Sequence, residues 1–341
     1  MKTFLFKIGF YLSFFLIASI SLYLTSKRNL IFDTPAKKFV KEFTSGDVIV
    51  TKEKSEDRRT SYQLAKHFSG KHFNCLFLGS SRIMQLGKNT HFPNSINLGV
   101  SAAGLRDIIE LQKIVKKFKI GYDTLILDFN PWTVTKIVEN HPNQFHALDN
   151  LQTGLLDIIK FNFNPENLWE LFSNENQFKR ANKKDIQNPN YFIRFTDGSI
   201  KQKTLGPNMK AGRVDFFCRD LYLLKQFYRI DSNLLNKYLE IIFQESQNHC
   251  VIVFLSPFHP ELFKRRSTDI RVQNLQKLES LFFSKKPKNV KVIGSFNPKN
   301  LDFGDPNFID GFHISESSIN ILFRKSSKLS AGFKQHNKSN F

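Results

Sequence analysis

The sequence predicts an α/β fold in which a parallel sheet is covered by helices on both faces, a three-layer arrangement. The first observation is a series of five short apolar runs, at residues 74–78, 95–98, 124–128, 250–255 and 290–293. The second is that amphipathic stretches separate these runs. Near-continuous apolar strands that alternate with helices are typical of a parallel sheet buried on both faces.

Three stretches are expected to supply helices of this fold. Residues 105–118 carry apolar side chains at helical spacing, directly after the second apolar run. Residues 221–245 and 272–283 stand between the later runs, and the first of these is expected to break near Asp231. Each helix can therefore cross over between neighbouring parallel strands.

An uncharged run at residues 8–25 is flanked by two basic residues on each side. Eighteen helical residues would cover about 27 Å, close to the ~30 Å hydrocarbon core of a bilayer. The end of the run lacks a small-x-small cleavage pattern, so we expect an uncleaved transmembrane helix, with a signal peptide as the alternative. A long folded domain after a short N-terminus predicts a single-pass cell-membrane protein whose C-terminal domain is extracytoplasmic.

The chain is expected to divide into five parts. These are an anchor (1–30), a charged stalk or linker (31–70), the α/β domain (71–135 and 215–325), an insertion (136–214) and a basic tail (326–341). Within the insertion, Asp197-Gly198 follows an apolar run and predicts a β-hairpin. We therefore expect an α+β insertion that serves as a lid or a substrate-binding element.

The composition excludes some classes of protein and favours others. Hydrophobic residues make up 41% of the chain, which excludes a disordered protein, and only one run is long enough to span a membrane. The 50 Lys and Arg exceed the 30 Asp and Glu, giving a net charge of +20. This surplus favours anionic partners, with a general bias toward lysine as the alternative. Nucleic acid is not expected, because no zinc or aromatic–basic motif supports it and an anchor argues against it.

The cysteines do not indicate a metal or redox site. Cys75, Cys218 and Cys250 have no CxxC spacing, which makes a zinc site or a dithiol motif unexpected. Cys75 and Cys250 stand beside apolar runs and are expected to be buried thiols, with a disulfide from Cys218 to one of them as the alternative. We expect neither a metal nor a cofactor.

Polar residues follow the expected strands at the edge where ligands of an open parallel sheet bind. Two serines follow the first strand, Asn130 the third and His259 the fourth, and Asp310 and His313 stand near the C-terminus. A serine hydroxyl becomes nucleophilic when an imidazole takes its proton, and a carboxylate orients that imidazole. Purely structural roles remain open, because serine and Asp are also common helix caps and Asn is a common turn residue.

This ordered set of motifs resembles the SGNH/GDSL hydrolase superfamily, whose domain is three-layered and flavodoxin-like. The family's Gly-Asp-Ser block matches Gly79-Ser80-Ser81, with Ser80 in place of the Asp, which implies that Ser81 is the nucleophile. The Asp-x-x-His block is present in full and implies that Asp310 and His313 complete a triad with Ser81. The resemblance covers residues 74–132 and 250–325.

Two other blocks depart from the family pattern. In the second, alignment on Asn97 puts Ala102 where the family has a glycine, and the third keeps only Asn130. The resemblance implies an oxyanion hole made by the backbone N–H groups of Ser81 and Ala102 and by the Asn130 amide.

Three further residues are candidates for substrate binding. The guanidinium of Arg82 matches a phosphate or a carboxylate of an acidic polymer, or pairs with a surface acid. Trp132 is a candidate platform or a packing residue. His259 lies between two prolines, which fix it for a structural or substrate-contacting role.

The Gly-Ser-Ser-Arg variant, the anchor and the Asn-Pro-Trp third block resemble one branch of the family in particular. It contains membrane-anchored proteins of bacterial surface-polymer O-acylation, of the alginate O-acetylation and teichoic acid D-alanylation type. The resemblance implies an extracytoplasmic serine-dependent acyl-ester hydrolase or O-acyltransferase that acts on a cell-surface polysaccharide or related polymer. The implied partners are the membrane, an anionic or glycan cell-envelope polymer and a membrane-bound acyl donor protein. The alternative is a catalytically inactive binding or assembly module of a membrane glycan-modifying complex.

Overall fold

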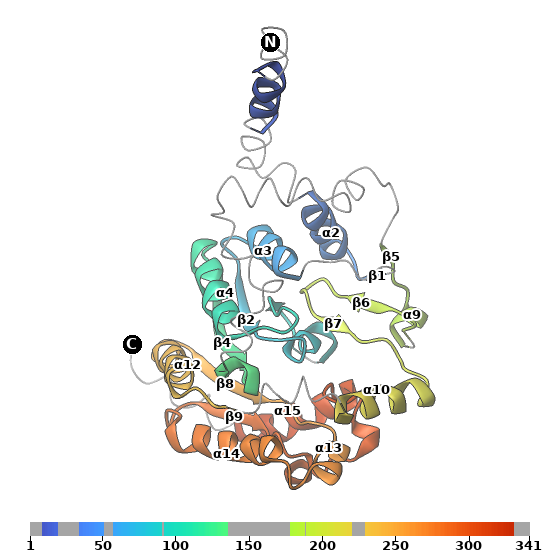
Figure 1. Ribbon diagram of the computed structural model, residues 1–341, viewed down its shortest axis with the longest axis vertical. Helices are drawn as coiled ribbons and strands as arrows, with labels where there is room; N and C mark the ends of the chain where they lie inside the picture. The colour runs from blue at the N-terminus through green and yellow to red at the C-terminus, as the bar shows by residue number, and fades with distance from the viewer. Residues whose placement is uncertain are drawn as a thin grey trace.

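The computed structural model describes residues 9–19, 34–50, 57–90, 92–135, 178–187, 189–219 and 229–330. At its centre is a parallel sheet of five strands (Figure 1). Across the sheet these are β3 (Ser95–Asn97), β2 (His72–Leu78), β4 (Gly121–Asp128), β8 (Cys250–Leu255) and β9 (Lys291–Gly294). The ladders between neighbours are all parallel. In chain order this is 2-1-3-4-5, the flavodoxin-like order, so the expected α/β class with a parallel sheet is confirmed.

Successive side chains of each strand point to opposite faces of the sheet, and both faces are apolar. In β2, Leu76 and Leu78 belong to one buried cluster and Phe77 belongs to a second. The helices that contribute to the first cluster include α4 (Leu105–Lys117), α12 (Ser232–Glu245) and α14 (Ile270–Lys285). The second cluster takes Ile319 and Leu322 from α15 (Glu316–Ser330). The three-layer arrangement therefore follows from strands that bury apolar side chains on both faces.

The helices expected at 105–118 and 272–283 are confirmed by α4 and α14. The expected break near Asp231 is the start of α12, where the Asp231 carboxylate accepts hydrogen bonds from the N–H groups of Asn233 and Leu234. This is a common N-cap arrangement, because the first N–H groups of a helix lack partners within it. Residues 220–228 of the expected helix lie outside the described residues.

The segment expected to be a stalk is folded against the domain, which corrects that prediction. It contains α2 (Thr34–Thr44), β1 (Val48–Val50) and α3 (Asp57–His67). Phe39 and Phe43 of α2 and Leu64 of α3 lie in the larger buried cluster. This stretch has an apolar stripe among its charged residues, so its mixed composition did not predict that it is buried against the domain.

The described part of the insertion pairs with this N-terminal segment. A second, antiparallel sheet has the order β5 (Phe178–Arg180), β1, β6 (Phe192–Arg194) and β7 (Ile200–Lys201), beside the main sheet in Figure 1. The hairpin expected at Asp197-Gly198 is confirmed, since it joins β6 to β7. Helix α9 (Lys183–Gln187) lies between β5 and β6 in the chain, and α10 (Pro207–Arg219) follows β7. Residues 136–177 of the predicted insertion lie outside the described residues.

The predicted anchor lies only partly within the description, which assigns a helix to residues 9–19. No helix among the described residues has both the length and the apolar character needed to cross a membrane. Residues 1–8 and 20–33 lie outside the described residues, so the anchor and the membrane location stay predictions. In the predicted tail, α15 runs to Ser330, and residues 331–341 are not described.

The three cysteines are free thiols, so the alternative of a Cys218 disulfide is wrong. Cys218 is buried, Cys75 is half-buried and Cys250 is exposed. The expectation of a buried Cys250 fails because it is the first residue of β8, where the strand is still near the surface. Burial raises the pKa of the Cys75 thiol to about 11.

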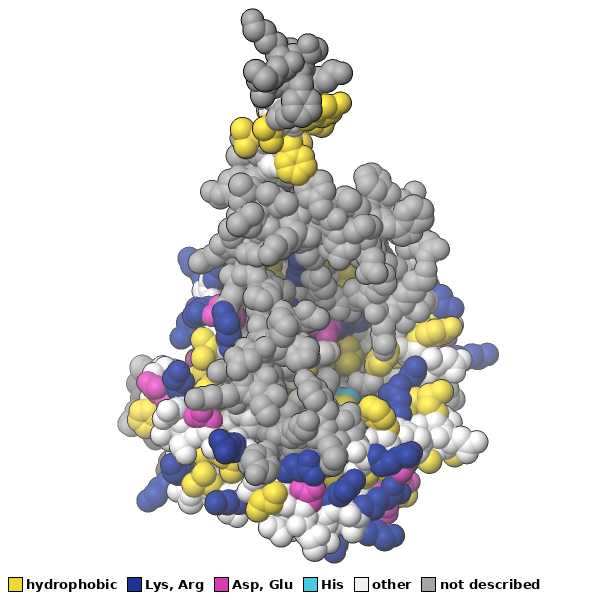
Figure 2. Space-filling model, viewed as in Figure 1, with side chains coloured by type: hydrophobic (Ala, Val, Ile, Leu, Met, Phe, Trp, Pro, Cys, Tyr) yellow, Lys and Arg dark blue, Asp and Glu magenta, His cyan; other side chains and the backbone are white. Residues whose placement is uncertain are grey.

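The positive charge of the chain is distributed rather than concentrated on the face shown in Figure 2. Lys and Arg side chains are spread over the visible part of the described residues, with Asp and Glu among them. This distribution agrees with a general bias toward lysine, the alternative that the composition left open.

We expect replacement of Gly79, directly after β2, to destabilise the protein more than replacement of Gly70 or Gly212. Its φ is +151°, and a Cβ there would lie 2.6 Å from the Cβ of Asp128. We expect Gly79→Ala to lower the free energy of unfolding by about 3 kcal/mol or more, from strain and overlap together. Gly70→Ala, at φ +75° but in open space, should cost about 1 kcal/mol.

Urea denaturation followed by circular dichroism would measure both values. Gly212→Ala is the matched control, because Gly212 lies in α10 with open space around it. That variant should be neutral or up to about 1 kcal/mol more stable. Equal losses for Gly79→Ala and Gly70→Ala would contradict the close approach to Asp128.

Candidate active site

The structure brings together the three residues of the expected triad, although 232 positions separate two of them. Ser81 Oγ lies 3.0 Å from His313 Nε2. His313 Nδ1 lies 2.9 Å from Asp310 Oδ2 on the other side of the ring. A hydroxyl, an imidazole and a carboxylate joined in this order are the groups of a serine nucleophile with its base and orienting acid.

Each member of this triad is held by local backbone structure. Ser81 follows the end of β2 through the tight Gly79-Ser80 turn. The Asp310 carboxylate accepts hydrogen bonds from the N–H groups of Phe312 (2.9 Å) and His313 (2.8 Å), which close a short turn before α15. The N–H of Ile309 donates to the His313 carbonyl at 2.8 Å. Asp310 thus shapes the loop that presents the imidazole, in addition to contacting it.

The surroundings of Asp310 keep it ionised. Burial alone would raise the pKa of this carboxyl, but the charge of His313 and its hydrogen bond, with those from two backbone N–H groups, lower the pKa well below the usual range. Arg213 of α10 adds a cation 3.9 Å from Asp310 Oδ2. The anion is therefore available to stabilise a positive charge on His313.

A second buried carboxylate, Asp128 at the end of β4, organises the turn beneath Ser81. It accepts hydrogen bonds from both the N–H and the hydroxyl of Ser80, the N–H at 2.9 Å. The Asn130 amide also donates to it. Burial raises the pKa of Asp128, and the hydrogen bonds from Ser80 and the charge of Arg82 oppose that rise. Asp128 was not among the predicted site residues, although its position at the end of an apolar strand is a signal in the sequence.

Arg82 is 1% exposed and does not reach the surface. Its Nη1 donates to Asn130 Oδ1 and to the Ser256 carbonyl, both at 3.0 Å. Its guanidinium carbon lies 4.0 Å from the centre of the Phe258 ring and 5.2 Å from that of Trp132. Burial lowers the pKa of Arg82 to about 9, although the charge of Asp128 opposes this. Pairing of Arg82 with a surface acid is therefore wrong, and its buried Nε and Nη2 have no hydrogen-bond partner among the described residues.

The position of Asn130 corrects its expected role as an oxyanion donor. Its amide nitrogen donates to Ser80 Oγ at 3.1 Å and to Asp128. An amide has two hydrogens, so both are used within the network. Asn130 instead links Ser80, Asp128 and Arg82 into one buried group.

Ala102 lies in a backbone conformation that favours glycine. Its φ is +51°, which costs roughly 1–2 kcal/mol for a residue with a Cβ. The neighbouring Val100 N–H donates to the Gly79 carbonyl at 2.9 Å, which ties this loop to the turn that carries Ser81. The glycine-like conformation agrees with the alignment of Ala102 to a family glycine.

The other two candidate substrate contacts lie within the protein. His259 is fully buried, its Nε2 lies 2.9 Å from Asp305 Oδ1, and its Nδ1 accepts the Glu261 N–H at the start of α13 (Pro260–Arg265). Trp132 is half-buried and packs against the larger cluster. The expected contact of His259 with substrate is therefore wrong, and the geometry of Trp132 supports packing.

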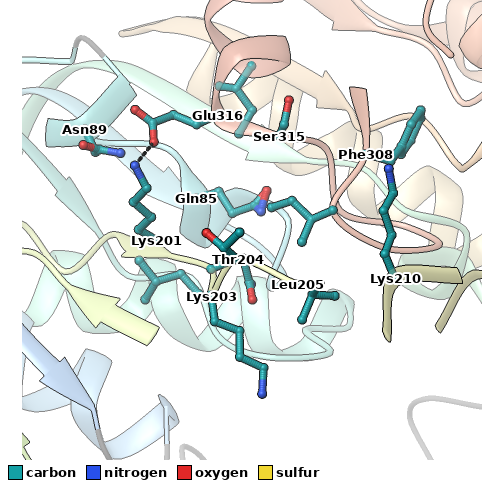
Figure 3. Close-up of a pocket in the computed structure, with 14 residues that line it drawn as sticks. Gln85, Asn89, Lys201, Lys203, Thr204, Leu205, Lys210, Phe308, Ser315 and Glu316 are labelled. Carbon is teal, nitrogen blue, oxygen red and sulfur yellow. Dashed lines mark ion pairs between the residues drawn. The ribbon is translucent and has the colours of Figure 1, made fainter. Parts of the chain in front are cut away.

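A cavity of about 230 Å³ is lined by Ser315, two residues after His313, but by none of the three triad residues (Figure 3). Its walls come from three parts of the chain: the segment after Ser81, the strand β7 with the residues that follow it, and the two sides of the Asp310–His313 turn. The sequence analysis did not identify this cavity, because it forms only where the insertion meets the main domain. Within the described part of the chain, no group of three or more His, Cys, Asp and Glu could hold a metal ion.

Comparison with known proteins adds little. No family model and no curated protein matches the chain. A solved structure from Streptococcus pneumonia, provisionally assigned as a platelet activating factor, is similar at 9% identity and TM-score 0.36, over 80% of this chain and 92% of the other. A member of the lipolytic G-D-S-L family from Veillonella parvula DSM 2008 is similar at 11% identity and TM-score 0.31, over 76% and 98%. These likenesses are too slight to carry an argument about activity.

The charge of Asp128 is expected to matter more than the hydrogen bond from the Ser80 hydroxyl. Asp128→Asn removes the counter-charge of the buried Arg82 and should lower the free energy of unfolding by about 3–5 kcal/mol. Ser80→Ala removes one buried donor and should cost about 1–3 kcal/mol.

Chemical denaturation of both variants would measure these losses. Asp123→Asn at the exposed end of the same strand is the matched control and should stay within about 0.5 kcal/mol of the wild type. If Ser80→Ala cost as much as Asp128→Asn, the electrostatic explanation would be wrong.

Replacement of Ala102 by glycine should relieve backbone strain without removing a backbone N–H. We expect Ala102→Gly to raise the free energy of unfolding by about 0.5–1 kcal/mol, since the strain exceeds the entropic cost of glycine. Thermal unfolding would measure the gain. Ala103→Gly is the control, because Ala103 is buried without a positive φ, and should be destabilised by about 1 kcal/mol. A loss of stability in Ala102→Gly would contradict the strain.

Proposed function

We propose that the chain is a serine-dependent acyl-ester hydrolase or O-acyltransferase. The observation that carries this proposal is the placement of His313 between Ser81 Oγ (3.0 Å) and Asp310 Oδ2 (2.9 Å). The half-buried position of Ser81 supports it, since the hydroxyl stays accessible while its partners are shielded from water. The order of the GDSL-like motifs in the sequence supports acyl-ester hydrolysis or acyl transfer as the class of reaction.

In the first step, the Ser81 oxygen forms a bond to the carbonyl carbon of an ester as its proton passes to His313 Nε2. The ester C–O bond then breaks, and the leaving alkoxide takes the proton from His313. The acyl group is left on Ser81. Asp310 keeps its negative charge throughout, and holds the ring so that Nε2 faces the hydroxyl.

In the second step, the oxygen of water or of a sugar hydroxyl bonds to the acyl carbonyl carbon, and His313 takes the proton of the attacking group. The C–O bond between the acyl group and Ser81 then breaks, and His313 returns the proton to Ser81 Oγ. Transfer to water gives a hydrolase, and transfer to a hydroxyl gives an acyltransferase. The negative oxygen formed in both steps needs donors, for which the N–H groups of Ser81 and Ala102 are the candidates. Because both amide hydrogens of Asn130 are used within the protein, these two backbone N–H groups would stabilise the negative oxygen without it.

We further propose an extracytoplasmic setting, with residues 1–30 as a membrane anchor and a cell-surface polysaccharide or related polymer as substrate. The uncharged run at 8–25 supports the anchor, and the polymer substrate rests on the resemblance of the sequence motifs to surface-polymer O-acylation proteins. A membrane-bound acyl donor protein would supply the acyl group if the protein is a transferase.

An inactive binding or assembly module is the second candidate. The observation that favours it is the Asn130 amide, which is bound within the protein and leaves no side-chain donor identified for an oxyanion. In such a module, the Ser81–His313 contact would be a structural hydrogen bond.

A serine-reactive probe separates the two candidates. We expect a fluorophosphonate to form a stoichiometric adduct on Ser81 of the purified 341-residue chain, located by mass spectrometry. His313→Ala should abolish labelling because the hydroxyl loses its base. Asp310→Asn should lower kcat for an aryl acetate by about 10³–10⁴-fold.

Ser101→Ala, an exposed serine in the neighbouring loop, is the matched control and should label like the wild type. A folded wild-type protein that takes no adduct and hydrolyses an aryl acetate no faster than Ser81→Ala would rule out the enzyme and favour the binding module.

A further inference from the structure

The turn that carries Asp310 and His313 packs against α10, a helix outside the stretches that the family resemblance covers. Figure 1 shows α10 beside α13, and Asp215 of α10 accepts a hydrogen bond from Arg265 Nη1 of α13 at 2.9 Å. Three side chains of α10 lead to the turn or to the loop before it: Lys210, Arg213 and Phe217. Their spacing of three and four residues places them on one face of the helix. This face of α10 is therefore directed toward the turn.

Two of these contacts are between charges. Lys210 Nζ donates to the Asp305 carbonyl at 2.7 Å and lies 2.9 Å from Asp305 Oδ2. Arg213 Nη1 lies 3.9 Å from Asp310 Oδ2. The Asp305 side chain is 63% exposed and that of Arg213 is 44% exposed. Ion pairs that are open to water stabilise little, so these two do not by themselves fix the position of the turn.

The third contact is apolar and buried. Phe217 lies in the larger buried cluster, with its ring centre 5.5 Å from that of Phe312 and 6.1 Å from that of Phe258. A Cβ on Gly311 would lie 2.5 Å from Phe217 Cγ and 2.6 Å from Phe217 Cβ. These two atoms lie next to the helix backbone, so a rotation of the side chain does not move both of them away. The backbone at Gly311 therefore packs directly on Phe217.

Space, rather than backbone conformation, is the reason for a glycine at position 311. Its φ is not in the positive range that favours glycine. The Gly311 carbonyl accepts the His259 N–H at 3.0 Å, so the middle of the turn is held by α10 and by the residue before α13. His313 follows two residues later, with its Nε2 3.0 Å from Ser81 Oγ. A shift of Gly311 is therefore expected to move the base relative to the nucleophile.

We propose that Phe217 is a positioning residue for His313, because its contact with Gly311 sets where the Asp310–His313 turn lies. The inference rests on the proposed function for its effect on catalysis, whereas the position of the turn is measurable without a reaction. Misplacement of a reacting group by about 1 Å costs on the order of 100-fold in rate. A helix outside the family blocks thus adjusts the geometry of the triad.

The test uses two substitutions on the full chain, alone and combined. Gly311→Ala should push the turn away from α10, and we expect it to lower kcat for an aryl acetate by about 10–100-fold, together with the rate of fluorophosphonate labelling of Ser81. KM should stay within about twofold of the wild type, because the base is displaced rather than the substrate. Phe217→Ala should lower kcat about fivefold, since the turn loses its support.

The combined variant separates this contact from general destabilisation. Phe217→Ala removes the ring, which supplies two of the three atoms that a Cβ on Gly311 would overlap. In this background, we expect the loss of kcat caused by Gly311→Ala to be smaller by about threefold or more. An equal loss in both backgrounds, or an unchanged kcat in Gly311→Ala alone, would overturn the proposal.

Two matched controls accompany these variants. Gly304→Ala adds the same methyl group in the loop before the turn, 3.7 Å from Pro306 Cδ, and should react like the wild type. Phe73→Ala removes a buried ring at the start of β2, the opposite end of the strand from Ser81, and should lower stability without lowering kcat. Circular dichroism verifies folding. Should Gly311→Ala fail to fold, a wild-type kcat in folded Phe217→Ala would overturn the proposal by itself.

Hydrogen exchange measures the position of the turn without any reaction. Because the His259 N–H donates to the Gly311 carbonyl, Gly311→Ala should speed its exchange about tenfold, and the combined variant should show a smaller increase. This result without a probe adduct on wild-type Ser81 would support the contact and refute the enzyme. An adduct on wild-type Ser81, with no effect of Gly311→Ala on labelling or exchange, would support the enzyme and refute the role of Phe217.

Discussion

The buried carboxylate of Asp128 is the constraint on which the candidate site depends. It lies at the end of β4 and receives the N–H and the hydroxyl of Ser80, so it fixes the turn immediately before Ser81. The absence of a side chain at Gly79 lets the two strand ends approach closely enough for these contacts. A charge buried in this way is costly unless it is paired. The rest of the network is explained by this requirement.

Arg82 and Asn130 meet that requirement together. Asn130 donates to the carboxylate and accepts from Arg82 Nη1, so it joins the anion to the cation. Phe258 and Trp132 surround the guanidinium and shield it from water. The residues that looked like oxyanion and substrate groups in the sequence are therefore used to stabilise the turn. Ser81 therefore follows a turn that is held by buried hydrogen bonds on several sides.

Two carboxylates serve the site, and their surroundings push their pKa values in opposite directions. Burial raises the pKa of Asp128, whereas the charge and hydrogen bond of His313 hold the pKa of Asp310 low. Only the second contacts the imidazole. This separation assigns a structural role to one acid and an orienting role to the other.

The features that could be predicted from the sequence are those that depend on local patterns and on the order of motifs along the chain. The five strands followed from apolar runs, and Ser81, Asp310 and His313 followed from motifs at strand ends. The burial of Arg82 could not be predicted, because its surroundings come from Phe258 and Trp132, which are distant in the chain. The prediction of a stalk at residues 31–70 was wrong because Phe39 and Phe43 form an apolar stripe within a charged segment. Pairing of β1 with β5 and β6 joins distant segments, for which a single sequence gives no signal.

The hairpin of the insertion is fixed to the main domain, which limits what it can do. The Asp197 carboxylate accepts the Lys88 N–H at 2.6 Å and the Ser95 hydroxyl at 3.0 Å, and the Asp197 carbonyl accepts the Asn97 N–H at 2.8 Å. Opening the hairpin as a lid would expose and break these largely buried bonds, each costing roughly 1–3 kcal/mol if left unpaired. The hairpin is therefore better suited to a fixed wall than to a gate. Because β7 is one strand of this hairpin, Lys201 and its ion pair with Glu316 at the start of α15 belong to the same fixed wall.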